Sequence, residues 1–278
     1  MSCNGNCEGC GSENNCDNCD GNCGHEIKKT AVLEDTHIKK IVAVLSGKGG
    51  VGKSMVTSLL ALELARAGKK VGILDSDITG PSIAKIFGFE GEIYGDEKGI
   101  VPYTTKGGIK AISINMMLED KEAPVLWRGP ILGGIINQFY GEVHWGELDY
   151  LLIDMPPGTG DVALTVFQNL PVDEVVMVTT PSKLVSMVVA KAINMTKEVK
   201  VPIVSLVENM AYVKCDKCGN KIEIYNHDDT ENVASKYGLE VLAKLPIDPS
   251  LANLVDESEI EQYDGNYLNE VVKRIIND

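Results

Sequence analysis

One segment near the amino-terminal end of the chain has the residues and spacing of a phosphate-binding loop. Ser46–Ser54 reads Ser-Gly-Lys-Gly-Gly-Val-Gly-Lys-Ser and contains the pattern G-x-x-x-x-G-K-[ST]. Glycines let successive backbone N–H groups converge on a phosphate, while the lysine reaches the β- and γ-phosphates and the serine hydroxyl reaches Mg²⁺. The pattern predicts an ATP site with these contributors: Gly47, Lys48, Gly49, Gly50, Val51, Gly52, Lys53 and Ser54.

Carboxylates follow two apolar runs further along the chain. Asp75 and Asp77 come after Val71–Leu74, and Asp154 comes after Leu151–Ile153. Short runs of this kind are typical of buried parallel strands, whose carboxyl ends face the ligand crevice of an α/β sheet. Asp154 therefore fits a residue that holds a Mg²⁺-bound water. The roles of Asp75 and of Asp161 stay open, because aspartate also starts turns and helices.

Cysteines form the second group of residues that could do chemistry. Cys215 and Cys218 form a lone C-x-x-C, which supplies two of the four ligands that a tetrahedral metal or an Fe–S cluster needs. A two-fold dimer completes the set, because each subunit brings two thiolates to one shared cluster. A zinc knuckle and a thioredoxin-type redox pair are the alternatives.

The other six cysteines lie within residues 1–25, a stretch of Cys, Asn, Gly, Asp and Glu without apolar periodicity. Such a composition forms no core without a metal or a partner. We expect a Cys-rich metal-binding leader, with its metal and full ligand set open. The candidate ligands of this second metal site are Cys7, Cys10, Cys16 and Cys19. A disordered metal-scavenging tail is the alternative.

The elements that must position these residues indicate an α/β fold. Short apolar runs alternate with helical stretches from Ile41 onward, which predicts a P-loop NTPase domain over 41–278 with a mostly parallel sheet covered by helices on both faces. Residues 26–40 are polar and predict a linker. The expected strands are Ile41–Leu45, Val71–Leu74, Leu151–Ile153, Glu174–Thr179 and Ile203–Val207, with a further one in Gly108–Asn115. The expected helices are Ser54–Ala67, Ser182–Glu198, Glu231–Tyr237 and Tyr267–Ile276.

Composition limits the classes of partner. The chain has 278 residues, 44% of them hydrophobic, and a net charge of −14 at pH 7. Such acidity argues against a nucleic-acid-coating protein, although a local nest of N–H groups still holds phosphates. No apolar run approaches the ~20 residues of a membrane span, and the first residues lack the features of a secretory signal. We expect a cytoplasmic protein with neither nucleic acid nor membrane as partner.

The spelling Lys-Gly-Gly-Val-Gly-Lys-Ser resembles the deviant Walker A family, which includes MinD-like, nitrogenase-iron-protein-like and Mrp-like ATPases. The resemblance implies a homodimer in which Lys48 reaches the partner's nucleotide, as an arginine finger does. It also implies that Asp77 lies near the attacking water and the magnesium ion. Asn209, in Val-Glu-Asn-Met, matches the residue that contacts adenine.

A longer series of motifs resembles the Mrp/ApbC-type iron–sulfur cluster carrier ATPases. Besides the phosphate loop and the C-x-x-C pair, the series comprises Asp75–Ser82, Trp127–Pro130, Trp145–Tyr150, Asp154–Asp161, Glu208–Met210 and Leu245–Pro249. The resemblance implies a slow ATP hydrolase that binds a [4Fe-4S] cluster across a homodimer and transfers it to apo-proteins.

Three other functions stay open. A MinD/ParA-like positioning ATPase needs a basic amphipathic segment, whereas Tyr267–Asp278 carries acids as well as bases. A nitrogenase-iron-protein-like electron donor resembles this chain but holds its cluster on two well-separated cysteines per subunit. A zinc-binding P-loop ATPase is the third.

Overall fold

The computed structural model describes residues 29–77, 80, 82–89, 93–116, 129–181, 183–215, 217–224 and 229–277. The Cys-rich leader with its candidate ligands Cys7, Cys10, Cys16 and Cys19 lies outside the described residues. So do Ile78, Thr79 and Pro81 of the Asp75–Ser82 motif and Trp127 and Arg128 of the Trp127–Pro130 motif.

A nine-stranded sheet forms the centre of the fold, in the order β10-β9-β8-β1-β7-β2-β6-β5, with β11 also paired to β9. The pairings of β5 with β6 and of β10 with β9 are antiparallel and the others are parallel. This arrangement confirms the predicted fold class. The strands are β1 (His37–Ser46), β2 (Val71–Asp75), β5 (Tyr103–Thr104), β6 (Lys110–Ser113), β7 (Glu147–Asp154), β8 (Glu174–Thr179), β9 (Ile203–Lys214), β10 (Lys221–Ile222) and β11 (Val241–Ile247).

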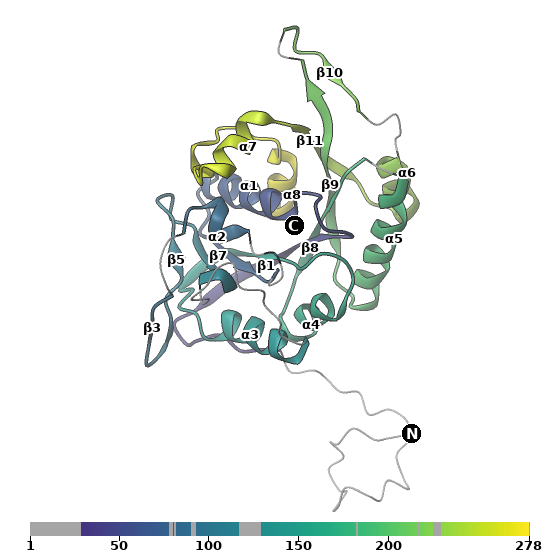
Figure 1. The fold of residues 1–278 in the computed structure, drawn as a ribbon. Coiled ribbons are helices and arrows are strands. Elements are labelled where there is room, and N and C mark those ends of the chain that lie inside the picture. Colours follow the sequence, from purple (N-terminus) through teal and green to yellow (C-terminus); the bar gives the residue numbers. More distant parts are fainter. Residues whose placement is uncertain are drawn as a thin grey trace, which may run out of the picture.

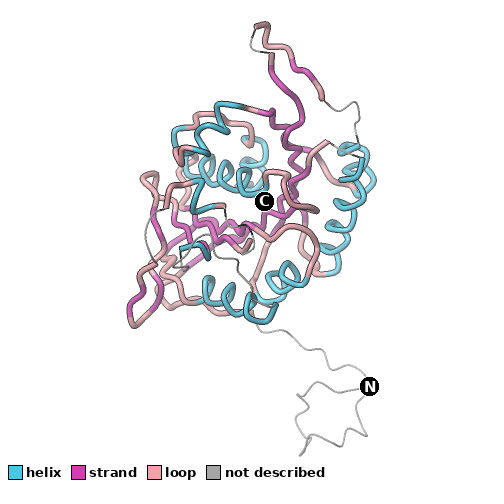
Figure 2. The backbone as a smooth tube through the Cα atoms, viewed as in Figure 1, coloured by secondary structure: helices cyan, strands magenta, loops and turns pink. Residues whose placement is uncertain are grey.

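Helices cover both faces of the sheet (Figures 1 and 2). Residues of α1, α2, α7 and α8 pack into one hydrophobic cluster, and residues of α3, α4, α5 and α6 pack into a second cluster on the opposite face. None of the described helices has the length and apolarity of a membrane span. The helices are α1 (Lys53–Arg66), α2 (Ile83–Ile86), α3 (Gly129–Gly141), α4 (Asp161–Asn169), α5 (Lys183–Glu198), α6 (Asp229–Tyr237), α7 (Pro249–Asp256) and α8 (Asn269–Asn277). Short 3-10 helices η1 (Ile114–Met116) and η2 (Ile260–Gln262) and a small hairpin of β3 (Gly95–Asp96) with β4 (Gly99–Ile100) complete the fold.

The first strand begins earlier than its apolar run. Three of its first four residues (His37, Lys39 and Lys40) are polar, yet this stretch pairs with the first half of β7. The segment before it is also attached to the domain, because Lys29 Nζ donates to the Phe167 and Leu170 carbonyls and Thr30 N donates to the Asn169 carbonyl. Contacts distant in sequence thus hold much of the stretch 26–40 against the domain.

The strand β9 continues past its predicted end at Val207. It runs on to Lys214 because β11 pairs with its later residues and β10 folds back on its last two. Figure 1 shows this end of β9 forming a hairpin with β10 that projects away from the body of the domain. The hairpin carries Cys215 and Cys218 beyond the main sheet.

Candidate nucleotide site and cysteine hairpin

The phosphate loop lies between the end of β1 and the start of α1. Gly50 and Gly52 have φ angles of 79° and 81°, a left-handed region that glycine adopts at low cost. Gly52 ends the loop, and α1 begins at Lys53. The partial positive charge of the α1 N-terminus therefore faces the loop, as an anion site requires.

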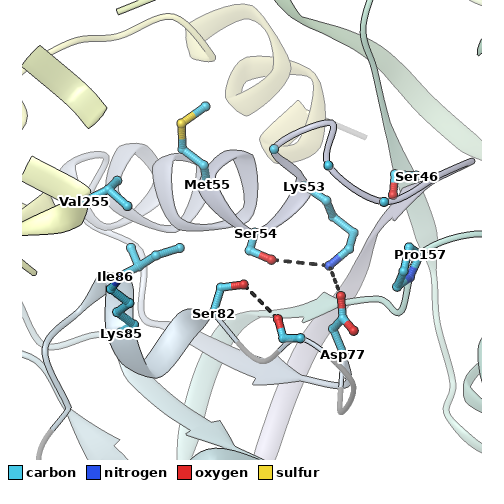
Figure 3. Close-up of a pocket in the computed structure, with 14 residues that line it drawn as sticks. Ser46, Lys53, Ser54, Met55, Asp77, Ser82, Lys85, Ile86, Pro157 and Val255 are labelled. Atoms are coloured by element: carbon cyan, nitrogen blue, oxygen red, sulfur yellow. Dashed lines mark hydrogen bonds and ion pairs between the residues drawn. The ribbon is translucent and has the colours of Figure 1, made fainter. Parts of the chain in front are cut away.

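A cleft of about 420 Å³ opens beside this loop. Figure 3 shows that it extends from Ser46 and Pro157 past Lys53 and Ser54 toward α2 and α7. Gly49, Gly50, Gly52 and Asp77 also line it. The loop and the carboxylate after β2, which are distant in sequence, therefore share one cavity.

Asp154 is the centre of the polar contacts under the loop. Its carboxylate is 0% exposed, and its Oδ1 lies 2.8 Å from Lys53 Nζ. Ser54 Oγ donates to Asp154 Oδ2 at 2.6 Å, and Thr57 Oγ1 donates to Oδ1 at 2.8 Å. Asp77 Oδ2 lies 3.6 Å from the same lysine nitrogen. The sequence analysis missed Thr57, whose signal is its position one helical turn after Lys53 on α1.

These groups suit a magnesium ion. Mg²⁺ prefers oxygen ligands and is usually held by one or two carboxylates together with substrate phosphates. The Ser54 hydroxyl and the carboxylates of Asp77 and Asp154 are oxygen donors gathered around the Lys53 ammonium. The residues present therefore fit the ion that the sequence predicted.

Asp75 lies behind the cleft and is 0% exposed. Its Oδ1 accepts from the Asp77 backbone N at 3.1 Å, and its Oδ2 accepts from Ser113 Oγ at 2.9 Å and from Ile83 N at 3.4 Å. Burial, and next the charge of Asp154, raise the pKa of Asp75 to about 8. Asp75 thus ties the segment that carries Asp77 to α2 and β6.

Asn209 reaches the phosphate loop from β9. It is 0% exposed, and its Nδ2 donates to the Val51 carbonyl at 2.9 Å. Among the described residues no group donates to its Oδ1, which is buried as well. A buried polar atom without a partner is costly in a folded protein and therefore needs an explanation, such as a functional role or a bound water or ion. Asn209 therefore offers one hydrogen-bond acceptor beside the loop.

Two predicted residues, Lys48 and Asp161, are exposed and do not line this cleft. Lys48 lies on the loop. Asp161 forms the first residue of α4, where a carboxylate favours the helix N-terminus.

Cys215 and Cys218 lie in the turn of the β9–β10 hairpin. Cys215 N donates to the Asn220 carbonyl at 2.9 Å, and Gly219 N donates to the Cys215 carbonyl at 2.8 Å. Cys215 is half-buried, Cys218 is exposed, and neither forms a disulfide. The part of the chain that the structure describes contains no group of three or more His, Cys, Asp or Glu side chains placed to hold a metal ion.

The chain matches the family described as NUBPL iron-transfer P-loop NTPase over residues 37–278. It belongs to this family. An iron-sulfur cluster carrier protein of Clostridium perfringens is 42% identical over 269 residues, which are 93% of this chain and 94% of that protein. A protein of the same description from Methanocaldococcus jannaschii is 43% identical over 255 residues, 88% of this chain and 85% of that protein. The resemblance seen in the sequence motifs is thereby confirmed.

Solved structures agree with membership of the iron-transfer P-loop NTPase family. A nucleotide-binding protein from Archaeoglobus fulgidus, solved in complex with ADP and described with Co, has a TM-score of 0.75 and 44% identity over 83% of this chain and 91% of that chain. The cell-division ATPase MinD of Pyrococcus furiosus has a TM-score of 0.60 at 20% identity, over 86% of this chain and 99% of that chain. The second likeness concerns the fold alone.

We predict that Gly52→Ala destabilises the nucleotide-free protein more than Gly50→Ala does. Both positions have φ near +80°, so both substitutions cost about 1–2 kcal/mol in backbone strain. A Cβ at position 52 would lie 2.3 Å from Asn209 Nδ2, whereas at position 50 it would meet nothing within 4 Å. Denaturant unfolding measures the difference. Equal destabilisation would mean that Asn209 does not pack against the loop.

We also predict that Asp75 makes stability fall as the pH rises. Its pKa is about 8 in the folded protein against a usual value of 3.8, so the folded state holds an extra proton between these limits. The wild type should therefore lose stability relative to Asp75→Asn as the pH is raised from about 5 to about 9. Denaturant unfolding of both proteins, free of nucleotide and magnesium, gives this comparison. A pH-independent difference would contradict the burial of an ionisable group here.

Proposed function

We propose that the chain is an ATP-dependent iron–sulfur cluster carrier that binds a [4Fe-4S] cluster across a homodimer and transfers it to apo-proteins of the cytoplasm. The observation that carries the proposal is the pair of thiols, Cys215 and Cys218, at the tip of a hairpin projecting from a P-loop NTPase. The relatives at 42% and 43% identity are described as iron-sulfur cluster carrier proteins, which agrees with it.

In this proposal five residues of the nucleotide site have roles. Lys53 exchanges its contacts with Asp154 and Asp77 for the β- and γ-phosphate oxygens when ATP enters. Ser54, Asp77 and Asp154 would hold Mg²⁺, which neutralises phosphate charge when bound. Asp77 also lines the cleft and would orient the attacking water. The Oδ1 of Asn209 accepts the adenine amino group, which completes its hydrogen bonding.

Lys48 completes the site from the other subunit. Its side chain is exposed and does not line the cleft of its own subunit, which is the arrangement expected of a cation that acts in trans. In a dimer it stabilises the charge that develops on the γ-phosphoryl group. The isolated subunit therefore hydrolyses ATP slowly.

Charge and apolar surface around the thiols favour a shared anionic cluster. The turn that carries the thiols is flanked by three exposed lysines, Lys214, Lys217 and Lys221, in a protein whose net charge is −14. Positive charge offsets the negative charge of a thiolate-bound cluster. Ile222 and Ile224 on the same hairpin are 52% and 49% exposed and give the second subunit an apolar surface to cover.

The leader has a separate part in the proposal. Residues 1–25 would be a Cys-rich segment that holds a second metal through Cys7, Cys10, Cys16 and Cys19, and the residues up to 36 would join it to the ATPase domain, whose first strand begins at His37. Four thiolates within one short segment are sufficient for an Fe–S cluster or a zinc ion.

We predict that Lys48→Ala lowers ATP hydrolysis by about 100-fold or more while the nucleotide affinity of the subunit changes little. Lys106→Ala, another exposed lysine, is the matched control and should leave hydrolysis unchanged. Mixing Lys48→Ala with the Asp77→Asn variant should restore activity, because the mixed dimer has one site with Asp77 and a partner Lys48. Failure of the mixture to recover activity would rule out action in trans.

The cluster assignment is tested in a full-length parent variant whose six leader cysteines are replaced by serine. After anaerobic reconstitution with iron and sulfide, this parent should show Fe–S absorption. Adding Cys215→Ala and Cys218→Ala should abolish the absorption and leave nucleotide affinity within about twofold. Absorption that persists without the two thiols, or a parent that takes up zinc but no cluster, would overturn the proposal.

A further inference from the structure

One strand joins the nucleotide site to the cysteine hairpin. Asn209, whose side chain contacts the phosphate loop, and Cys215, in the hairpin turn, belong to the same run of β9 and its continuation. Five residues lie between them, so the backbone spans at most about 20 Å from one to the other. Figure 1 shows β9 leading directly from the sheet into the projecting hairpin. The connection between the two sites is therefore a single backbone segment.

The pairing of this strand is interrupted between the two sites. Lys244 of β11 pairs with Glu208, but the next paired residue, Pro246, lies opposite Tyr212. Four steps along β9 thus match two steps along β11, and the extra residues are those around Met210. Bulges of this kind bend a strand and change the direction of its later residues.

Met210 lies at the centre of this bulge in a costly conformation. Its φ angle is 56°, in the left-handed region that non-glycine residues avoid by about 1–2 kcal/mol. The half-buried methionine directly follows Asn209, whose Nδ2 is bound to the Val51 carbonyl. Strain at a joint persists only where the contacts on both sides impose it. Here these are the loop contact of Asn209 and the pairing of Tyr212 and Val213 with β11.

We infer that Met210 is a positioning residue whose left-handed backbone sets the direction of the Cys215/Cys218 hairpin and transmits nucleotide occupancy to it. A nucleotide that donates a hydrogen bond to the unpartnered Oδ1 of Asn209 restrains this side chain more firmly. The constraint then passes to Met210, because the two residues share a peptide unit, and from it to the hairpin. The inference rests on the proposed nucleotide contact of Asn209 and extends the carrier function to a physical link between ATP and the cluster.

Hydrogen exchange of the full-length protein, read by mass spectrometry, tests the link without any cluster. In the wild type, adding ADP with Mg²⁺ should slow exchange of the hairpin amides 213–222 by at least about twofold. Met210→Gly removes the conformational preference at the joint, so the hairpin effect should disappear while protection of the phosphate loop remains. Met210→Ala keeps the cost of positive φ and should retain the effect.

Lys200→Gly is the matched control, because Lys200 also has positive φ, at 58°, but lies in the turn before β9. It should leave the hairpin effect unchanged. Retention of the effect in Met210→Gly, its loss in Met210→Ala or Lys200→Gly, or its absence from the wild type would overturn the inference. If only the carrier function fails, the reconstituted protein shows no Fe–S absorption, but ADP still slows exchange of its hairpin amides. The two failures are therefore distinguishable.

Discussion

The buried contact between Lys53 and Asp154 is the interaction on which the nucleotide site depends. It joins the first residue of α1 to the last residue of β7, and the Asp154 carboxylate is 0% exposed. Removing one partner of such a pair leaves an uncompensated buried charge, which costs about 3–5 kcal/mol. The pair therefore holds the loop in the shape that phosphates require, and phosphate oxygens can replace the carboxylates as partners of the lysine.

Much of the site could be predicted from the sequence because its signals are local. The glycines of the phosphate loop, the aspartates at strand ends and the apolar run of β8 each reflect a requirement met within a few residues. Thr57, the early start of β1 and the extension of β9 could not be predicted in this way. Each depends on a partner distant in sequence: Asp154 for Thr57, β7 for β1, and β10 and β11 for β9.

The same distinction explains the cysteine hairpin and Asp75. The C-x-x-C spacing indicates a metal ligand pair, but its place at the tip of a projecting hairpin depends on strand pairing. The sequence left the role of Asp75 open, whereas the fold buries this residue and attaches it to Ser113 of β6. The chemical roles open to these residues could be predicted from the sequence. Their burial and contacts could not, because these depend on the fold.

The central claim is that two subunits share one cluster, and stoichiometry tests it most directly. Native mass spectrometry with iron analysis would be applied to the reconstituted full-length protein with its leader cysteines replaced by serine. The account predicts a dimer carrying a single [4Fe-4S] cluster, about two iron atoms per chain. A monomer that carries a whole cluster, or one metal ion bound to each chain, would contradict it.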